Sequence, residues 1–368
     1  MMNAERYTVE HETRYAYAAP VSQSWQLARL TPRTLPWQKL LSHSLQIDPT
    51  PDERRDELDS FGNMVTHFGL HGAHRMLRVR MECQVEVTPR PPVQADGPTA
   101  LPPLSSDPLW SALPPSGGPF QMQLQMQMQM QMQMQMQMQM QMQAQSQSQG
   151  LGLGQGHVQE HGHGQQGLAS VANGWEAVRD AIRREPQLDN LAPASMCEPT
   201  RLVPLSEGAR VYAMASLARG RPWFDAVVDL MRRIHADFEF EPGATTVSTS
   251  VDEVLHQRSG VCQDFAHLML ACLRGHGLPA RYVSGYLLTE PPPGMPRLMG
   301  VDASHAWVAA YAPQHGWAEF DPTNDQLADQ RYITLSWGAD FADVVPLRGV
   351  IVGGGDQRMN VQVSVIPA

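Results

Sequence analysis

The segment Ser259-Gly260-Val261-Cys262-Gln263-Asp264-Phe265-Ala266-His267 carries the clearest structural signal in the chain. It predicts a tight glycine turn that opens a helix, with Cys262 at the entry. The positive end of the helix dipole favours a thiolate, the reactive form of cysteine, at such a position. The alternative is a small, inert core residue, because free cysteines are usually buried. Residues further along the chain decide between the two.

Composition and charge limit the class of protein. The 368 residues are enough for two domains with connecting material. A formal net charge of −10 argues against nucleic acid or an anionic membrane as the main partner. The start of the chain lacks the apolar core of a secretory signal, and no window is apolar enough to span a membrane. We therefore expect a cytoplasmic protein, with no membrane or nucleic-acid partner.

The four cysteines show neither metal-type spacing nor a dense disulfide framework. Cys272 falls on the apolar face of the helix that begins at Cys262, so we interpret it as a core residue. The sequence predicts no metal site and no cofactor.

The first part of the chain predicts a small antiparallel β domain over 1–90. Short β-prone segments alternate with turns rich in proline and glycine, which is typical of such domains. The strand candidates are 6–17, 21–30, 42–48 and 76–88.

Residues 91–172 form a Pro-rich and low-complexity linker that we expect to be disordered. Gln and Met alternate from Gln121 to Gln143, and this two-residue repeat fixes no strand register. The histidines and the acid that follow could hold a metal weakly, but we favour a flexible polar tract because nothing preorganises them. They are His157, Glu160, His161 and His163.

Ordered structure is predicted again over 173–345, in an α+β core. Apolar residues at helical spacing predict a set of helices, and β-prone runs predict an antiparallel sheet against which the Cys262 helix packs. The helix candidates are 176–184, 209–218, 223–238, 251–258 and the stretch from Cys262 to the glycines at 275 and 277. Residues 346–368 form a C-terminal segment whose last strand packs back on a sheet.

A hairpin brings a histidine and an aspartate together. The strands 304–311 and 317–321 flank a turn that contains Pro313 and Gly316. His305 and Asp321 are directly opposed if the turn centres on residue 313. They are diagonal neighbours within roughly 8 Å if it centres on residue 314.

Cys262, His305 and Asp321 together point to nucleophilic acyl transfer. The thiolate would attack a carbonyl, His305 would move the proton, and Asp321 would orient the imidazole. Taken alone, His305 is more simply an ordinary strand histidine and Asp321 a turn residue before Pro322. The arrangement of all three favours the catalytic interpretation.

Several motifs resemble the bacterial transglutaminase-like family. They are Gly260–Ala266, Gly277–Tyr286, Ser304–Val308 and Gly316–Asn324, with Tyr7–Thr13 and the segments near Pro20 and Pro32 resembling the β domain that precedes the core in that family. The resemblance covers 1–90 and 175–365, and it implies a papain-like cysteine-enzyme fold for the core that follows the β domain. It also implies Cys262 as the nucleophile, His305 as the base and Asp321 as the orienting acid.

Two departures from the family pattern stand out. The Gln/Met tract has no counterpart, and Ala309-Ala310 stand where the family often has an acidic residue, which we expect to alter the substrate surface. Trp307 and Trp317 could wall a channel for an acyl acceptor, but large aromatic residues are more often core.

The reaction itself stays open at this level. We expect a protein or peptide substrate, with transamidation ahead of proteolysis or amide hydrolysis. An inactive peptide-binding scaffold is a third possibility, because function follows the site rather than the fold.

Overall fold

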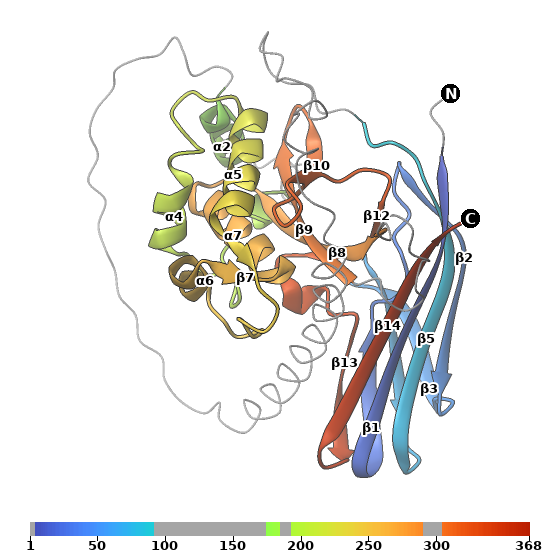
Figure 1. Cartoon of the computed structure of the whole chain (residues 1–368). Helices are drawn as coiled ribbons and strands as arrows, with labels where there is room; N and C mark the ends of the chain where they lie inside the picture. Colours follow the sequence, from blue (N-terminus) through green and yellow to red (C-terminus); the bar gives the residue numbers. More distant parts are fainter. Residues whose placement is uncertain (1–3, 92–173, 185–192, 290–303) are drawn as a thin grey trace, which may run out of the picture.

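The computed structural model describes residues 4–91, 174–184, 193–289 and 304–368, and Figure 1 shows them as two connected parts. A sheet of long strands carries both ends of the chain. The second part holds the helices and a shorter sheet. The predicted linker lies outside the described residues apart from Pro91, as do the Gln/Met tract and the histidines that follow it.

Strand β1 (Glu5–Ala28) is the central element of the long sheet. Its first half lies between β5 (His74–Val87) and the C-terminal strand, and its second half lies between β4 (Met64–Leu70) and β13. Alternate side chains of the first half are buried, which is the period of a strand with one face on a core. The predicted N-terminal antiparallel domain is therefore confirmed.

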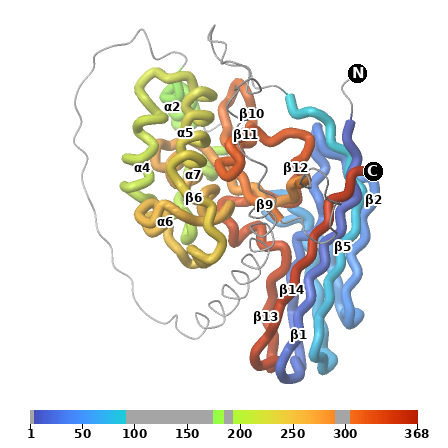
Figure 2. Tube along the Cα trace, in the orientation of Figure 1, coloured from blue at the N-terminus to red at the C-terminus, as the bar shows by residue number. Residues whose placement is uncertain are grey.

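The end of the chain completes this sheet. Strands β13 (Leu347–Gly353) and β14 (Gln357–Pro367) both pair antiparallel with β1, and they run alongside it in Figure 2. The expectation that the last strand packs back on a sheet is confirmed. The three glycines at 353–355 turn the chain between the two strands, all with φ in the left-handed region that glycine tolerates best.

The strand pattern differs from the prediction in two ways. The segments 6–17 and 21–30 are one strand, because the break near Pro20 is a register shift against β5 between Ala16 and Val21 rather than a turn. The strands β4 and β3 (Glu53–Leu58) were also not predicted. The side chains of β3 are mostly charged and exposed, and they show no apolar alternation. β2 (Gln38–Asp48) lies at the opposite edge of the sheet from β3.

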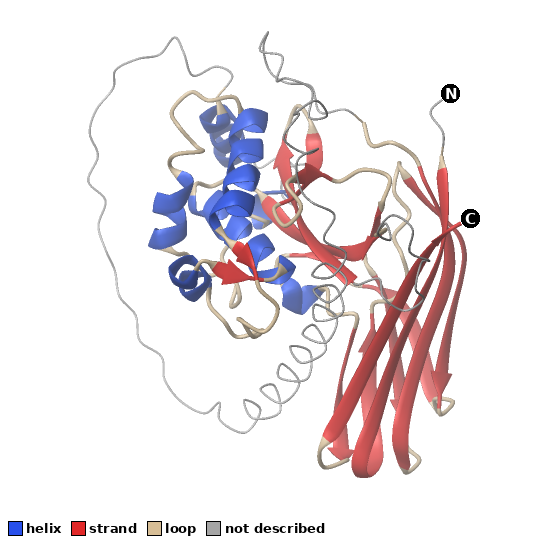
Figure 3. Cartoon of the chain, viewed as in Figure 1, coloured by secondary structure: helices blue, strands red, loops and turns tan. Residues whose placement is uncertain are grey.

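The second part is an antiparallel sheet with helices packed against it, as predicted (Figure 3). Its strand order is β11 (Gln326–Leu327), β10 (Gly316–Asp321), β9 (Ser304–Ala312), β8 (Ala280–Leu287) and β12 (Tyr332–Gly338). The helices are α2 (Trp175–Arg184), α4 (Glu207–Ala213), α5 (Trp223–Asp237), α6 (Val251–Gln257) and α7 (Cys262–Gly275). One core of buried side chains joins the helices to the alanine-rich face of β9.

Most helix ends follow local signals. Ser250 and Glu253 form a capping box at the start of α6, and Arg258 ends that helix with φ 59°. The prediction for 209–218 was wrong at both ends. The helix α4 begins two residues earlier than predicted, at Glu207, where the Ser206 side chain caps it by accepting the Ala209 N–H. A tight turn at Met214 ends the helix. No helix in the described part of the chain is long and apolar enough to cross a membrane.

The two parts meet along a continuous polar and apolar junction. Tyr286, Ile333 and Leu335 of the shorter sheet pack into the core of the N-terminal sheet. The Gln38 side chain accepts the Thr334 N–H at 2.7 Å and donates to the Thr334 carbonyl at 2.8 Å.

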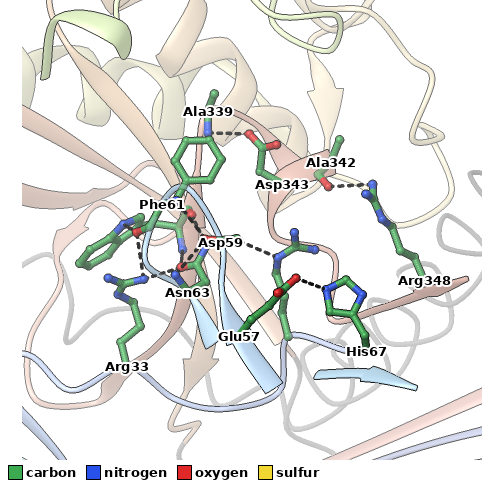
Figure 4. Close-up of polar contacts among 12 residues, drawn as sticks. Arg33, Glu57, Asp59, Phe61, Asn63, His67, Ala339, Ala342, Asp343 and Arg348 are labelled. Carbon is green, nitrogen blue, oxygen red and sulfur yellow. Dashed lines mark hydrogen bonds and ion pairs between the residues drawn. The ribbon is translucent and has the colours of Figure 1, made fainter. Parts of the chain in front are cut away.

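Figure 4 shows a second polar cluster at this junction, around the turn between β3 and β4. Arg33 donates to the Asn63 side chain at 2.6 Å, and Asn63 donates to Asp59 at 3.0 Å. Asn63 also bonds both backbone groups of Trp337 at the end of β12. These contacts fix the N-terminal domain against the sheet that carries the candidate site.

Candidate active site

The start of α7 is built around Asp264. Its carboxylate accepts hydrogen bonds from the Val261 N–H at 2.8 Å and from the Thr245 hydroxyl at 2.6 Å, which caps the helix. Burial raises the pKa of Asp264 to about 6, although these two bonds pull it down. A side chain at Gly260 would come within 2.9 Å of this carboxylate, so the glycine makes room for the cap. The motif before and after Cys262 therefore serves to place the thiol.

The hairpin of β9 and β10 follows one of the two registers considered. Gly316 pairs with Ala312, and Phe320 pairs with Val308, so the turn centres on residue 314. His305 and Asp321 are then diagonal neighbours on the same face of the sheet.

The structure places His305 and Asp321 in direct contact. His305 Nε2 lies 2.7 Å from Asp321 Oδ2, and both side chains are buried. An N–H on Nε2 that donates to the carboxylate leaves the other ring nitrogen for a partner on the opposite side.

The Cys262 thiol also hydrogen-bonds to the imidazole of His305. Burial lowers the pKa of His305, but the opposing effects of Asp321 and Cys262 are larger in sum and raise it to about 10. His305 is therefore an imidazolium at neutral pH, and it lies beside the Cys262 side chain. The structure thus brings together all three residues singled out from the sequence.

Asp321 has further partners that sequence reasoning missed. Its Oδ2 accepts the Tyr332 hydroxyl and the Asn324 amide, each at 2.6 Å, and its Oδ1 accepts the Thr323 N–H at 2.9 Å. Burial disfavours the carboxylate, yet His305, Tyr332 and Asn324 hold the pKa of Asp321 below its ordinary value. Asn324, three residues from Asp321 in a turn, was recognisable as a local partner. Tyr332 comes from another strand and carried no local signal.

The two tryptophans of the hairpin differ in burial. Trp307 is fully buried, and its ring lies against His305 with centroids 6.1 Å apart and planes 26° apart. Trp317 is half-buried and lies under the Arg281 guanidinium, 4.1 Å from its ring centroid. The core interpretation fits Trp307.

The departure at Ala309-Ala310 has a different consequence from the one expected. Both alanines are fully buried in β9, so the prediction that they alter the substrate surface is wrong. Ala309 is the cross-strand partner of Glu319, whose carboxylate lies over the same face of the sheet. A small side chain at Ala309 leaves space for that acid.

The other cysteines stand in apolar surroundings. Cys272 is fully buried in the core, as predicted, and burial raises its pKa. Burial also raises the pKa of Cys83 to about 12 and of Cys197 to about 11. None of the four cysteines, all of which lie in the described residues, forms a disulfide.

This arrangement can perform nucleophilic chemistry without further groups. It has a thiol at a helix start, an imidazole in contact with it, and a buried carboxylate that holds the imidazole. These are the parts that acyl transfer through a thioester requires.

Two family models match the chain. Residues 7–86 match the bacterial transglutaminase-like N-terminal region, and residues 213–322 match the transglutaminase-like superfamily. The second match includes Cys262, His305 and Asp321.

Relatives cover the full chain or its core. A Mycobacterium tuberculosis protein of uncharacterized function is 35% identical over 373 residues, covering 100% of this chain and 94% of its own length. A Pseudomonas aeruginosa protein-glutamine gamma-glutamyltransferase is 36% identical over 131 residues, which are 30% of this chain and 20% of that enzyme.

A solved structure shows the same fold. A candidate cysteine protease from Cytophaga hutchinsonii superimposes with a TM-score of 0.63 at 16% identity, covering 99% of this chain and 91% of that one. At this identity the likeness concerns the fold alone.

Proposed function

Because this chain belongs to the bacterial transglutaminase-like family, we propose that it catalyses cysteine-dependent acyl transfer on amide groups of proteins or peptides. The observation that carries the proposal is the buried contact of His305 with both Asp321 and the Cys262 thiol. Cys262 acts as the nucleophile, His305 as the general acid and base, and Asp321 as the orienting carboxylate.

In the first half-reaction the Cys262 thiolate attacks the carbonyl carbon of a glutamine side-chain amide. The C–N bond breaks as the His305 imidazolium gives its proton to the departing ammonia, which leaves a thioester on Cys262. Asp321 stabilises the imidazolium and holds the ring so that Nε2 faces the carboxylate.

In the second half-reaction a primary amine attacks the thioester carbonyl. His305 takes the proton from the amine, the C–S bond breaks, and the thiolate returns. With water as the acceptor, the same steps convert the glutamine side chain of the substrate to glutamate. With a backbone amide as the donor, they cleave the peptide bond.

We place transamidation first, because the P. aeruginosa relative that matches the core is named a protein-glutamine gamma-glutamyltransferase. Hydrolysis is the second candidate. Its support is the enclosure of Trp307, which removes one wall that would shield a thioester from water. The cysteines of the described residues are not joined in disulfides, which supports a reducing compartment, and we propose the cytoplasm.

The test is incubation of the protein with a glutamine-containing peptide library and a fluorescent primary amine. A Cys262→Ala variant removes the nucleophile, and Cys197→Ala is the matched control because that thiol is half-buried and outside the site. We expect amine incorporation that Cys262→Ala abolishes and Cys197→Ala retains.

Cys262-dependent release of ammonia or peptide cleavage without incorporation would replace transamidation by hydrolysis. Absence of any Cys262-dependent product would overturn the proposal and favour an inactive peptide-binding scaffold.

A further inference from the structure

Arg90 reaches from the N-terminal domain into the catalytic sheet. It follows β5 by three residues, and the Thr88 N–H donates to the Trp37 carbonyl at 2.9 Å, which fixes the direction of the chain there. The Arg90 side chain is only 12% exposed. Its guanidinium makes contacts in two directions, and each ends at the candidate active site.

The first direction leads to His305. Arg90 Nε and Nη2 donate to Glu319 Oε2 at 3.2 and 2.9 Å, and the Trp307 indole N–H donates to the same oxygen at 3.1 Å. The Trp307 ring in turn lies against the imidazole of His305. Glu319 thus links the guanidinium to the ring that flanks the imidazole.

The second direction leads to Asp321. Arg90 donates to the backbone carbonyls of Asp329 and of Tyr332, the latter at 3.3 Å. The Tyr332 hydroxyl donates to Asp321 Oδ2 at 2.6 Å, and its ring packs edge-on against Trp307, with centroids 5.2 Å apart. Trp307 and Tyr332, the two aromatic residues that contact the His305 ring, are therefore both connected to Arg90.

We propose that Arg90 is a positioning residue that orients His305 and Asp321 through Glu319, Trp307 and Tyr332. The N-terminal β domain then contributes to thiol reactivity through Arg90. This inference rests on the proposed function, since it concerns the same imidazole.

The position of the Trp307 ring depends on Arg90 because Glu319, which joins the two side chains, is buried. The Glu319 side chain is 2% exposed, and Arg90 is the ion-pair partner that the structure shows for it. A buried carboxylate that loses its paired cation is strongly destabilised, so its side chain shifts. This shift disturbs the acceptor of the Trp307 N–H and loosens the ring against which His305 is held.

The test follows the rate at which iodoacetamide alkylates Cys262 in the full-length protein, as a function of pH. This readout needs no substrate and reports how well the imidazole supports the thiolate. In Arg90→Gln we expect the rate at pH 6 to fall about 10- to 100-fold, because small misplacements of catalytic groups have effects of this size. We also expect the pH midpoint to move to higher pH.

Two further variants separate positioning from folding. Trp307→Phe keeps a ring against His305 but removes the N–H to Glu319, and we expect it to shift the midpoint in the same direction. Arg90→Lys keeps the charge and should restore part of the rate. Arg6→Gln is the matched control, because Arg6 forms an exposed ion pair with Glu86 at 2.8 Å on the same sheet.

The alkylation rates distinguish a failure of the proposed function from a failure of the positioning role of Arg90. If the parent protein shows no enhanced Cys262 reactivity at pH 6, the proposed function fails. If the parent is reactive and Arg90→Gln keeps its rate and midpoint, the positioning role is overturned, whatever happens to the melting temperature. A lower melting temperature with an unchanged midpoint would make Arg90 a structural residue only.

Discussion

Two buried histidines, one in each sheet, show how differently the same side chain behaves in this molecule. His11 in the N-terminal sheet bonds the Tyr286 hydroxyl at 2.8 Å and the Thr13 hydroxyl at 3.2 Å. Burial lowers its pKa to about 4, so it is neutral at physiological pH. His305 is buried as well, but a carboxylate and a thiol raise its pKa.

Burial alone gives a neutral, structural imidazole, as at His11. A charged imidazole inside the protein needs an anion beside it, and here that anion is Asp321. The ion pair marks the catalytic sheet as the place where proton transfer can occur. Hydroxyl partners, such as those of His11, hold an imidazole without charging it.

The largest effect is expected from removing the carboxylate beside His305. Asp321→Asn keeps the size of the side chain but not its charge, so it no longer stabilises the imidazolium or fixes the tautomer. We expect the rate of Cys262-dependent turnover to fall on the order of 10⁴-fold, as for the equivalent change in a serine-protease triad. The measurement is kcat for amine incorporation.

The matched change at the other histidine is Tyr286→Phe, which removes a hydroxyl partner of His11. We expect a loss of about 1–3 kcal/mol in the free energy of unfolding, because a buried ring nitrogen loses its partner. Turnover should stay near that of the parent. A large loss of turnover in Tyr286→Phe would contradict the purely structural role of His11.

A smaller effect is expected in the dependence of stability on pH. An unfolded histidine titrates near pH 6.5. The pKa of His305 is raised to about 10, so its contribution is complete below pH 6.5 and is lost as the pH rises toward 10. The pKa of His11 is lowered to about 4, so the unfolded chain takes up its proton first, and stability falls as the pH drops from 6.5 to 4.

The measurement is the free energy of unfolding by denaturant at pH 5, 7 and 9. His305→Asn should flatten the alkaline side, and His11→Asn should flatten the acid side by up to about 1.4 kcal/mol per pH unit. His267, whose pKa burial also lowers to about 4, keeps part of the acid slope in the second variant. Identical pH profiles for the two variants would contradict the opposite charge states.

Local patterns were enough to predict much of this site. The turn chemistry between β9 and β10 limited His305 and Asp321 to two registers, and both registers placed them close together. Glycine and the helix pattern located Cys262 at the start of α7. These features depend on neighbours within about 20 residues, where strand and helix periods apply.

Features that depend on distant partners were not predictable. Arg90 and Glu319 are 229 positions apart, and nothing near either residue signals the pair. Strand β3 was missed because an exposed edge strand needs no apolar alternation, and β1 was divided at Pro20 because a bulge and a turn have similar sequences. Tertiary contacts decided each of these cases.

Competitive alkylation of the four cysteines at pH 6 shows whether His305 and Asp321 activate the Cys262 thiol. Exposure alone would place Cys197 first, because it is half-buried while the other three are buried. We predict that iodoacetamide labels Cys262 fastest, by peptide mass spectrometry of the folded protein, and that His305→Asn removes this preference. Labelling of Cys197 ahead of Cys262, or equal rates at all four positions, would contradict the account.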